Sequence, residues 1–308
     1  MTPAQLKPSN AIGFAYFMLA ITLTGLAVIL SAQPFGFAWL TGQLLFAIAF
    51  LEWFIVLHEA GHHTLFRYRL ANMMAGYISG FFSLIPFTAW CHIHARHHAW
   101  TGWQDMDATT ATLVPRKLSA WEKVAINFAW KTWLPLFSIL YRLQNYWHPI
   151  RLRQFLSASV MPRMRIEMLA LLLAYVALVW WVGLWQLMSH CGLGLLLALM
   201  IQDPLLLSQH THIPSNLANG KAVRPFPPRE QEIYTRSIRF PAWFSLLIMH
   251  FDAHELHHIS VQAPGYRLRR IDYQPKNEVH WWIWLCAAKR LSGVDFLLGR
   301  RDETGFKY

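Results

Sequence analysis

Three short histidine clusters hold the residues best suited to chemistry in this sequence. They are His58-Glu-Ala-Gly-His62-His63, His94-Ala-Arg-His97-His98 and His254-Glu-Leu-His257-His258. On a helix, residues three and four positions apart share a face, so each cluster directs two or three imidazoles at one point. Neutral imidazole is the commonest metal ligand among protein side chains. The spacing therefore predicts a metal site with more than one ion.

The elements that must position these clusters are membrane helices. Of the 308 residues, 55% are hydrophobic and only 14% are charged, and 16 Trp and 20 Phe are among them. This composition is typical of a membrane protein. Two uncharged stretches, 11–30 and 169–188, are long enough to span a bilayer, and 37–57 and 192–207 are two further candidates that carry Glu52 and Asp203. We expect the first span to be retained rather than cleaved as a signal peptide.

The expected architecture is an all-α membrane protein forming one integral-membrane domain over residues 1–308. Four transmembrane helices would form two hairpins, with interfacial helices and a cytoplasmic histidine-rich cap. Residues 121–141 mix aromatic and charged side chains, as an interfacial amphipathic helix would. The cytoplasmic segments would be 64–165 and 208–308.

The basic residues predict the orientation. One of the 27 Lys and Arg residues precedes the first span, twelve lie between 64 and 165, and fourteen follow 208, so the expected hairpin tips at 31–36 and 189–191 have none. By the positive-inside rule, both termini and all histidine clusters would be cytoplasmic, in a membrane that we take to be a bacterial inner membrane. The net charge of +11 then fits attraction to anionic lipid headgroups. Nucleic acid is not an expected partner, because the basic residues are dispersed among tryptophans.

Two metal sites of other classes use only part of the pattern. The His58-Glu59-x-x-His62 segment matches the H-E-x-x-H motif of zinc proteases, which would leave the other two clusters unexplained. Di-iron carboxylate proteins use Glu-x-x-His pairs, which Glu59 and Glu255 could form, but most imidazoles would then be idle. We expect Glu59 and Glu255 to orient imidazoles instead. Asp203 has the same expected role, with a structural hydrogen bond as the open alternative.

A pair of irons would use every cluster. Two ions with four or five imidazoles each need about nine histidines, and His210 at the end of the fourth span can add to the eight in the clusters. Imidazole binds iron well and leaves it redox-active, which suits oxygen activation. The three cysteines, at 91, 191 and 286, lack a C-x-x-C spacing, so no zinc ribbon or rubredoxin-type iron site is encoded.

These motifs resemble those of the membrane-bound fatty acid desaturases and their hydroxylase relatives. Residues 90–102 are similar to that family's W-x-x-x-H-x-x-H-H-x-x-T-G motif, and Asp105 and Asp107 follow. Residues 209–212 resemble its Q-H-T-H, and 254–268 resemble its third histidine box with the trailing P-x-Y-x-L. The resemblance covers about residues 40–270. One departure is Leu206, where some relatives have an Asn that approaches one iron.

The resemblance implies a di-iron centre, O2 as co-substrate, and the following ligands: His58, His62, His94, His97, His98, His210, His254, His257 and His258. His63 and His212 adjoin ligand positions and are additional candidate ligands. The implied function is O2-dependent attack on C–H bonds of a lipid acyl chain, with fatty acid desaturation preferred. A lipid or carotenoid hydroxylase or ketolase is the alternative within the family.

The expected partners are an acyl substrate and a separate electron donor, either a ferredoxin or a cytochrome b5-like protein. The sequence has no His-Pro-Gly-Gly motif and no cysteine-rich iron–sulfur motif, so a fused donor is not expected. Nothing in the sequence distinguishes acyl-CoA, acyl-carrier protein, lipid or carotenoid as the substrate.

Overall fold

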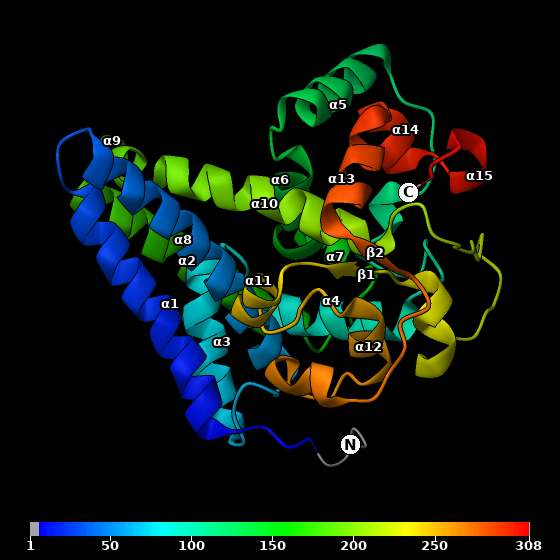
Figure 1. Cartoon of the computed structure of the whole chain (residues 1–308), viewed down its shortest axis with the longest axis horizontal. Coiled ribbons are helices and arrows are strands. Elements are labelled where there is room, and N and C mark those ends of the chain that lie inside the picture. The colour runs from blue at the N-terminus through cyan, green and yellow to red at the C-terminus, as the bar shows by residue number, and fades with distance from the viewer. Residues whose placement is uncertain (1–5, 308) are drawn as a thin grey trace. The chain divides into compact units, whose positions relative to one another are not determined.

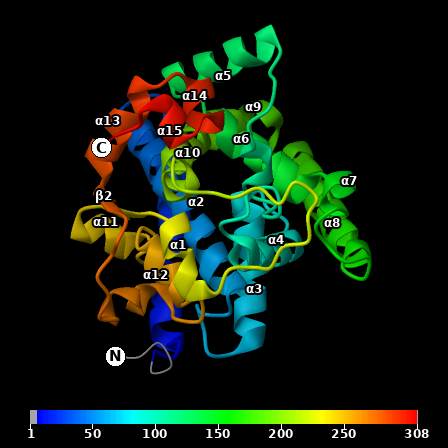
Figure 2. The ribbon, with the colours of Figure 1, turned by 90° about the vertical axis from the view of Figure 1, so that its right-hand side faces the viewer.

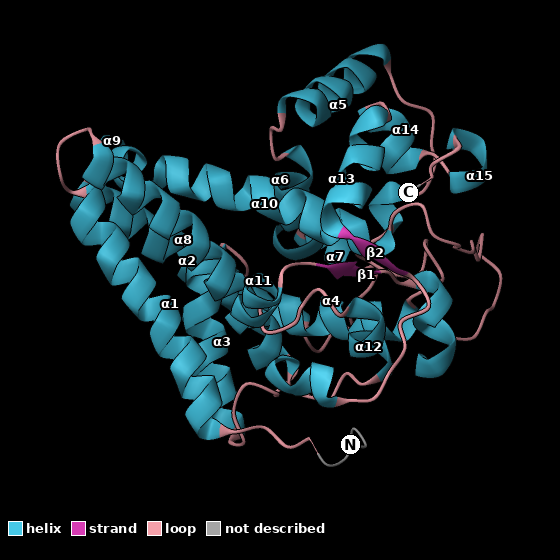
Figure 3. Ribbon diagram, in the orientation of Figure 1, coloured by secondary structure: helices cyan, strands magenta, loops and turns pink. Residues whose placement is uncertain are grey.

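The computed structural model describes residues 6–307, and nearly all their regular structure is helical (Figure 3). The expected helical class is confirmed, with one small addition. Strands β1 (Ser237–Arg239) and β2 (Glu278–His280) pair in parallel, so that Ile238 lies opposite Val279. The described residues divide into two units, one formed by residues 7–92 and 142–201 and the other by 6, 93–141 and 202–307. We call them the membrane unit and the histidine unit.

Among the described residues, four helices are long and apolar enough to cross a membrane. Three are α1 (Asn10–Ser31), α2 (Phe37–Gly61) and α8 (Met161–Val182). The fourth, Leu184–His210, joins α9 (Leu184–Leu187), a π-helical turn (Met188–Gly192) and α10 (Leu193–His210). The first two spans agree with the expected ranges to within four residues.

In the membrane unit, helices α1 and α2 lie side by side (Figure 1). Small residues allow this close approach. A Cβ atom on Gly42 would collide with the backbone of Ser31, and Ala20 and Ala27 of α1 are fully buried. The Trp53 indole N–H of α2 also donates to Thr24 Oγ1 at 2.9 Å. These contacts hold the helix that carries the first histidine cluster.

The expected bounds of the third span and of the second hairpin tip were wrong. Helix α8 begins at Met161, eight residues before the expected start, and the chain is helical through 189–191. The break lies instead at Gly183, whose φ of +90° few other residues adopt. The charged residues in the first turns of α8 lowered the local hydropathy, so the expected span did not include them. In the structure these side chains form hydrogen bonds. Arg163 donates to Tyr77 Oη at 2.6 Å, and the Glu167 carboxylate accepts from the amides of Phe87 and Thr88.

Those two amides begin α4 (Phe87–Trp100), which carries the second histidine cluster. It follows α3 (Arg69–Ser83) after a bend of 98°. Leu84 has a left-handed conformation with φ of 58°, and Pro86 precedes α4, so the backbone cannot continue as one helix. The Glu167 carboxylate satisfies amides that a helix N-terminus would otherwise leave unpaired. The membrane unit also contains the short helix α7 (Pro149–Leu152).

In the histidine unit, the expected interfacial helix at 121–141 is two helices, α5 (Ala120–Thr132) and α6 (Leu136–Arg142), separated at Trp133 and Pro135. The other helices are α11 (Ala242–Leu247), α12 (His254–Ile259), α13 (Trp281–Arg290), α14 (Gly293–Leu298) and α15 (Arg301–Thr304). Helices α5 and α14 pack together (Figure 2), and the Trp130 and Phe296 rings stack with centroids 4.4 Å apart. Short 3-10 helices at Ala111–Leu113, Pro228–Tyr234 and Gly265–Arg270 connect these elements.

Candidate metal centre

Helix α12 is held in place by the two-stranded sheet, which fixes the third histidine cluster. The Glu255 amide donates to Ser237 Oγ of β1 at 3.1 Å. The Glu255 carboxylate accepts from the amides of Lys276 and Asn277, both at 2.9 Å, just before β2. Glu255 therefore ties α12 to both strands. The expected contact between this carboxylate and an imidazole is not among the bonds that the structure gives it.

Four histidines of the histidine unit converge on one point. His97 comes from α4, His210 from the end of α10, and His254 and His258 from α12. One ligand atom from each lies within 4.8 Å of all the others. The Nε2 atoms of His210 and His254 are 2.8 Å apart, and those of His254 and His258 are 3.1 Å apart. We call this group the four-histidine cluster.

Hydrogen bonds at the outer nitrogens aim these rings inward. His97 Nδ1 donates to the Asp107 carboxylate at 2.7 Å, and His258 Nδ1 donates to Gln231 Oε1 at 3.0 Å. His210 Nδ1 lies 3.3 Å from the carbonyl of Tyr234. A proton held on Nδ1 leaves the Nε2 lone pair directed at the centre, which is how metal-binding histidines are usually oriented.

Asp107 is the strongest of these orienting groups. Its side chain is buried, and Thr109 also donates to it through its amide and its hydroxyl, both at 2.9 Å. Burial alone would raise the pKa of the carboxyl, but the interaction with His97 and the hydrogen bonds from His97 and Thr109 outweigh it and hold the pKa at about 2. Asp107 is therefore ionised at physiological pH and accepts the Nδ1 proton of His97 as a carboxylate.

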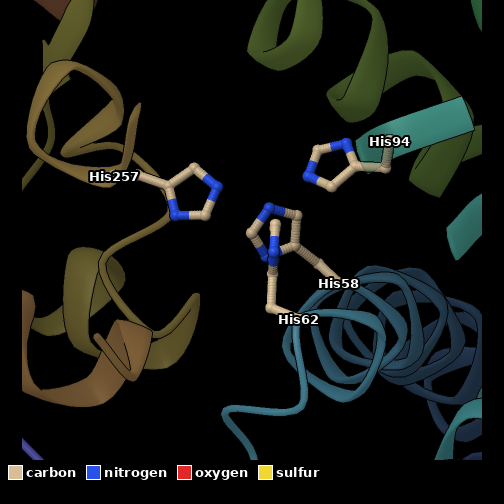
Figure 4. Close-up of side chains that lie close together, drawn as sticks. All are labelled: His58, His62, His94 and His257. Carbon is tan, nitrogen blue, oxygen red and sulfur yellow. The ribbon is translucent and has the colours of Figure 1, made fainter. Parts of the chain in front are cut away.

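A second group, which we call the three-histidine cluster, lies in the same unit. His98 Nε2 is 3.1 Å from Nε2 of His94 and 3.1 Å from Nε2 of His257. Figure 4 shows His94 and His257 with ring nitrogens turned toward each other, and the ring centroids are 6.2 Å apart. The rings of His98 and His258 are 4.3 Å apart, so the two clusters adjoin.

The membrane unit supplies its own pair at the end of α2, drawn in Figure 4. The His58 and His62 ring centroids are 4.7 Å apart, as residues one helical turn apart allow. Both rings contact the Trp90 ring edge to face, and that ring fits against Gly61, where a Cβ atom would collide with it. Glu59 accepts from His58 Nδ1 at 3.1 Å and from Thr64 Oγ1 at 2.7 Å.

The chemistry of the donor set fits a metal ion. Nε2 lone pairs that face each other at about 3 Å repel unless a proton or a cation lies between them. Burial opposes the proton: it lowers the pKa of His258 well below its ordinary value, and nearby imidazoles lower it further. A divalent transition metal satisfies all the lone pairs at once, and a set made only of imidazole suits iron, zinc or copper.

Three expected residues lie outside these clusters. His63 has φ of 59° and is exposed beyond the end of α2. His212 Nε2 is 2.9 Å from the carbonyl of Phe296, and its Nδ1 is 3.2 Å from Thr304 Oγ1, so both ring nitrogens have protein partners. Asp203 accepts from the Ser138 amide at 2.6 Å, which favours the structural alternative for this residue. Their roles at a metal remain predictions.

Sequence reasoning did not assign Gln231, Tyr234 or Thr109 to the site. Asp107 was noticed only as part of a motif, although an acid ten residues after a histidine in a buried helix–turn segment is a usable signal. Gln231 gives no such signal, because it lies in a 3-10 helix distant in sequence from both clusters.

We expect Asp107→Asn to weaken metal binding by roughly 10- to 100-fold, the usual cost of removing an orienting partner of a metal-bound histidine. The amide no longer carries a charge and can present its N–H to His97 Nδ1, which favours the wrong tautomer. Metal titration of the stripped protein measures this. Asp105→Asn is the matched control, since among the described residues Asp105 accepts from the backbone amides of Ala218 and Asn219 and from no imidazole. Equal affinities in both variants would contradict the role of Asp107.

A family model and several known proteins match this chain. The family model described as fatty acid desaturase matches residues 11–284. An acyl-lipid (9+3)-(E)-desaturase of Dimorphotheca sinuata is 34% identical over 31% of this chain and 25% of its own length. An sn-1 oleoyl-lipid 12-desaturase of Anabaena variabilis is 23% identical over 84% of this chain and 71% of its own length.

An oleoyl-12-hydroxylase of Ricinus communis is 30% identical over 29% of this chain and 23% of its length. The chain thus matches only about a quarter of the length of the two plant relatives. The family model, in contrast, covers most of the chain and includes all the histidine clusters. The chain belongs to the fatty acid desaturase family.

Proposed function

We propose that this protein is an O2-dependent di-iron membrane oxidoreductase that desaturates the acyl chain of a lipid. The observation that carries the proposal is the convergence of seven buried or half-buried imidazoles in two adjoining clusters, with their Nε2 atoms facing inward. Membership of the fatty acid desaturase family supports the reaction type. The curated relatives named above support a lipid acyl chain as the substrate.

In this proposal the four-histidine cluster holds one iron. The three-histidine cluster holds the other, with His58 and His62 as the remaining ligands, an assignment that rests on the family's order of histidine boxes. When bound, the iron pair supplies O2 reduction and removal of hydrogen from a methylene group. The protein's own residues orient the imidazoles, through Asp107, Gln231 and the Tyr234 carbonyl at one cluster and through Glu59 at His58.

A dry surrounding protects such chemistry from side reactions. His97, His254, His257 and His258 are each less than 5% exposed, so bulk water does not reach most of the site. The substrate must therefore enter with its reacting methylene already positioned, and that positioning supplies a large part of the rate. We further propose two helical hairpins with both termini and all histidine clusters on the cytoplasmic side, as the positive-inside rule predicts.

Hydroxylation is the second candidate, because the oleoyl-12-hydroxylase of Ricinus communis is among the relatives. The same removal of hydrogen followed by return of oxygen to carbon gives an alcohol. An intramembrane zinc protease is disfavoured by the Glu59 carboxylate. It accepts from His58 and Thr64, whereas the general base of such an enzyme must face a metal-bound water.

Lipid profiling of cells that express the chain tests the proposed reaction. The intact protein is expected to introduce a new double bond into membrane acyl chains, and His257→Ala is expected to abolish it. A hydroxyl group in place of the double bond would favour the second candidate. Profiles that are the same with the intact protein and with His257→Ala would contradict both.

Two electrons per turnover must come from a separate donor, and we propose a small acidic protein of the ferredoxin or cytochrome b5 type. A donor guided by charge to a protein with a net charge of +11 should associate more slowly as salt screens the attraction. We expect kcat/KM for the donor to fall at least about tenfold between 20 mM and 300 mM salt. The control is a small uncharged reductant, whose rate should not change, and a flat response to salt with both would contradict docking by charge.

A further inference from the structure

A cavity of about 470 Å³ lies in the histidine unit, and no histidine is among the described residues that line it. Its walls are the segment 115–118, which leads into α5, together with Lys123 of α5 and the end of α14. A volume of several hundred Å³ is typical of sites for small molecules. Nothing in the proposed metal chemistry uses this cavity.

The walls of the cavity are mainly positive. Arg116, Lys117 and Lys123 line it, and Asp295 is the one acid among its lining residues. The Asp295 carboxylate already accepts from Ser292 Oγ at 2.7 Å, and Arg116 pairs with Glu122 at 2.9 Å. No carboxylate of the described residues forms an ion pair with Lys117 or Lys123. Two uncompensated cations facing one cavity fit an anionic ligand.

The helix beside the cavity has the character of an interfacial helix. Trp121, Val124 and Phe128 of α5 are 73%, 68% and 59% exposed. Their spacing of three and four places them on one face, where they form an apolar stripe about two turns long. Such a stripe lies among acyl chains, and the lysines near it extend to the headgroup level. The anion that this cavity meets in a membrane is therefore a lipid headgroup.

The cavity also adjoins the metal centre. Pro115, Leu298 and Gly299 line both this cavity and a smaller one of about 30 Å³, and His210 of the four-histidine cluster lines the smaller one. A lipid held by its headgroup in the larger cavity would thus be bound close to the predicted ligands. This proximity favours the headgroup of the substrate itself over that of an unrelated lipid.

We propose that Arg116, Lys117 and Lys123 bind the phosphate of a phospholipid headgroup, and that this lipid carries the acyl chain to be oxidised. The inference rests on the proposed function for the identity of the lipid as substrate. The binding itself is independent of turnover. The substrate would then be a phospholipid, and not an acyl-CoA, an acyl-carrier protein or a carotenoid.

Isothermal titration of the purified full chain in uncharged detergent micelles tests this binding. The titrants are dihexanoyl-phosphatidylglycerol, dihexanoylglycerol, coenzyme A and inorganic phosphate. The variant is Lys117→Glu with Lys123→Glu. The matched control is Lys221→Glu with Arg224→Glu, which makes the same change of charge at two exposed residues elsewhere in the histidine unit. Thermal unfolding of both variants verifies that they are folded, and Lys117→Gln with Lys123→Gln replaces the first variant if it is not.

We expect the phosphatidylglycerol to bind the unaltered chain and the control variant equally, and the cavity variant at least about tenfold more weakly. Dihexanoylglycerol lacks the phosphate, so it should bind the unaltered chain no more tightly than it binds the cavity variant. Unchanged phosphatidylglycerol binding in the cavity variant would overturn the proposal. Coenzyme A that binds the unaltered chain more tightly than the phosphatidylglycerol does, and loses this binding in the cavity variant, would also overturn it, because the site would then be one for a carrier thioester. The same result with inorganic phosphate would likewise overturn it and make the site one for a free anion. None of these outcomes depends on activity, so the lipid profile still tests the proposed function separately.

Discussion

Replacing His258 by alanine is expected to reduce turnover by roughly a thousandfold or more and to remove one of two irons. His258 is 1% exposed, and its ring centroid lies 4.3–5.4 Å from those of His97, His98, His210 and His254. His258 therefore adjoins members of both clusters. Loss of an orienting partner alone costs 10- to 100-fold at metal sites, so loss of a ligand should cost more. Metal content and desaturation rate of the purified variant measure the two effects.

His148→Ala is the matched control, because His148 is exposed and belongs to the membrane unit, where its Nδ1 accepts from the Arg151 amide. This variant should keep both its iron and its rate. Retention of two irons and of a near-normal rate by His258→Ala would show that the four-histidine cluster is structural. That outcome would remove the metal from the centre of the proposed function.

The largest expected effect on stability is that of Arg236→Met. The Arg236 guanidinium is fully buried and donates to the carbonyls of Ser208, Thr211 and His212 at 2.8, 2.9 and 3.0 Å. These are carbonyls at the C-terminal end of α10, which have no partners within the helix and attract a positive charge. Methionine would leave them buried without donors. We expect the free energy of unfolding to fall by about 3–5 kcal/mol.

The same substitution should also weaken metal binding, because His210 lies between the carbonyls that Arg236 holds. Chemical unfolding in detergent, together with metal titration, measures both changes. Arg239→Met is the control three residues away, in β1, since Arg239 is exposed and an exposed charge contributes little. A loss of less than about 1 kcal/mol for Arg236→Met would mean that water or a rearranged helix end replaces the guanidinium.

The sequence predicted the parts of the site that depend on helical spacing. His94, His97 and His98 share a face of α4, and His254, His257 and His258 share a face of α12, and the structure brings these residues together. The spacing rule could not predict what lies behind the rings. Asp107 reaches His97 only because the chain turns after Trp100, and Gln231 reaches His258 from a segment that no periodicity marks. His212 illustrates the reverse case, a histidine two residues from a cluster member whose ring is held by α14 and α15.

For the membrane spans too, the sequence predicted what depends on local pattern and missed what depends on tertiary contacts. Hydropathy located α1 and α2 well, because their apolar runs end at loops or at the first histidine cluster. It failed at α8 because Arg163 and Glu167 look like loop residues in the sequence. Their partners, Tyr77 and the start of α4, are some 80 residues away along the chain. Because these charged side chains have hydrogen-bond partners, they cost less to place in a helix than unpaired charges would. Only the tertiary structure reveals the partners, since they are distant in sequence.

The metal content of the chain, purified from cells grown with 57Fe, tests the central claim most directly. The account predicts close to two irons per chain, with Mössbauer spectra of high-spin iron ligated by nitrogen, and about one iron in His258→Ala. One zinc per chain with no bound iron, unchanged in His258→Ala and lost in His58→Ala, would contradict it.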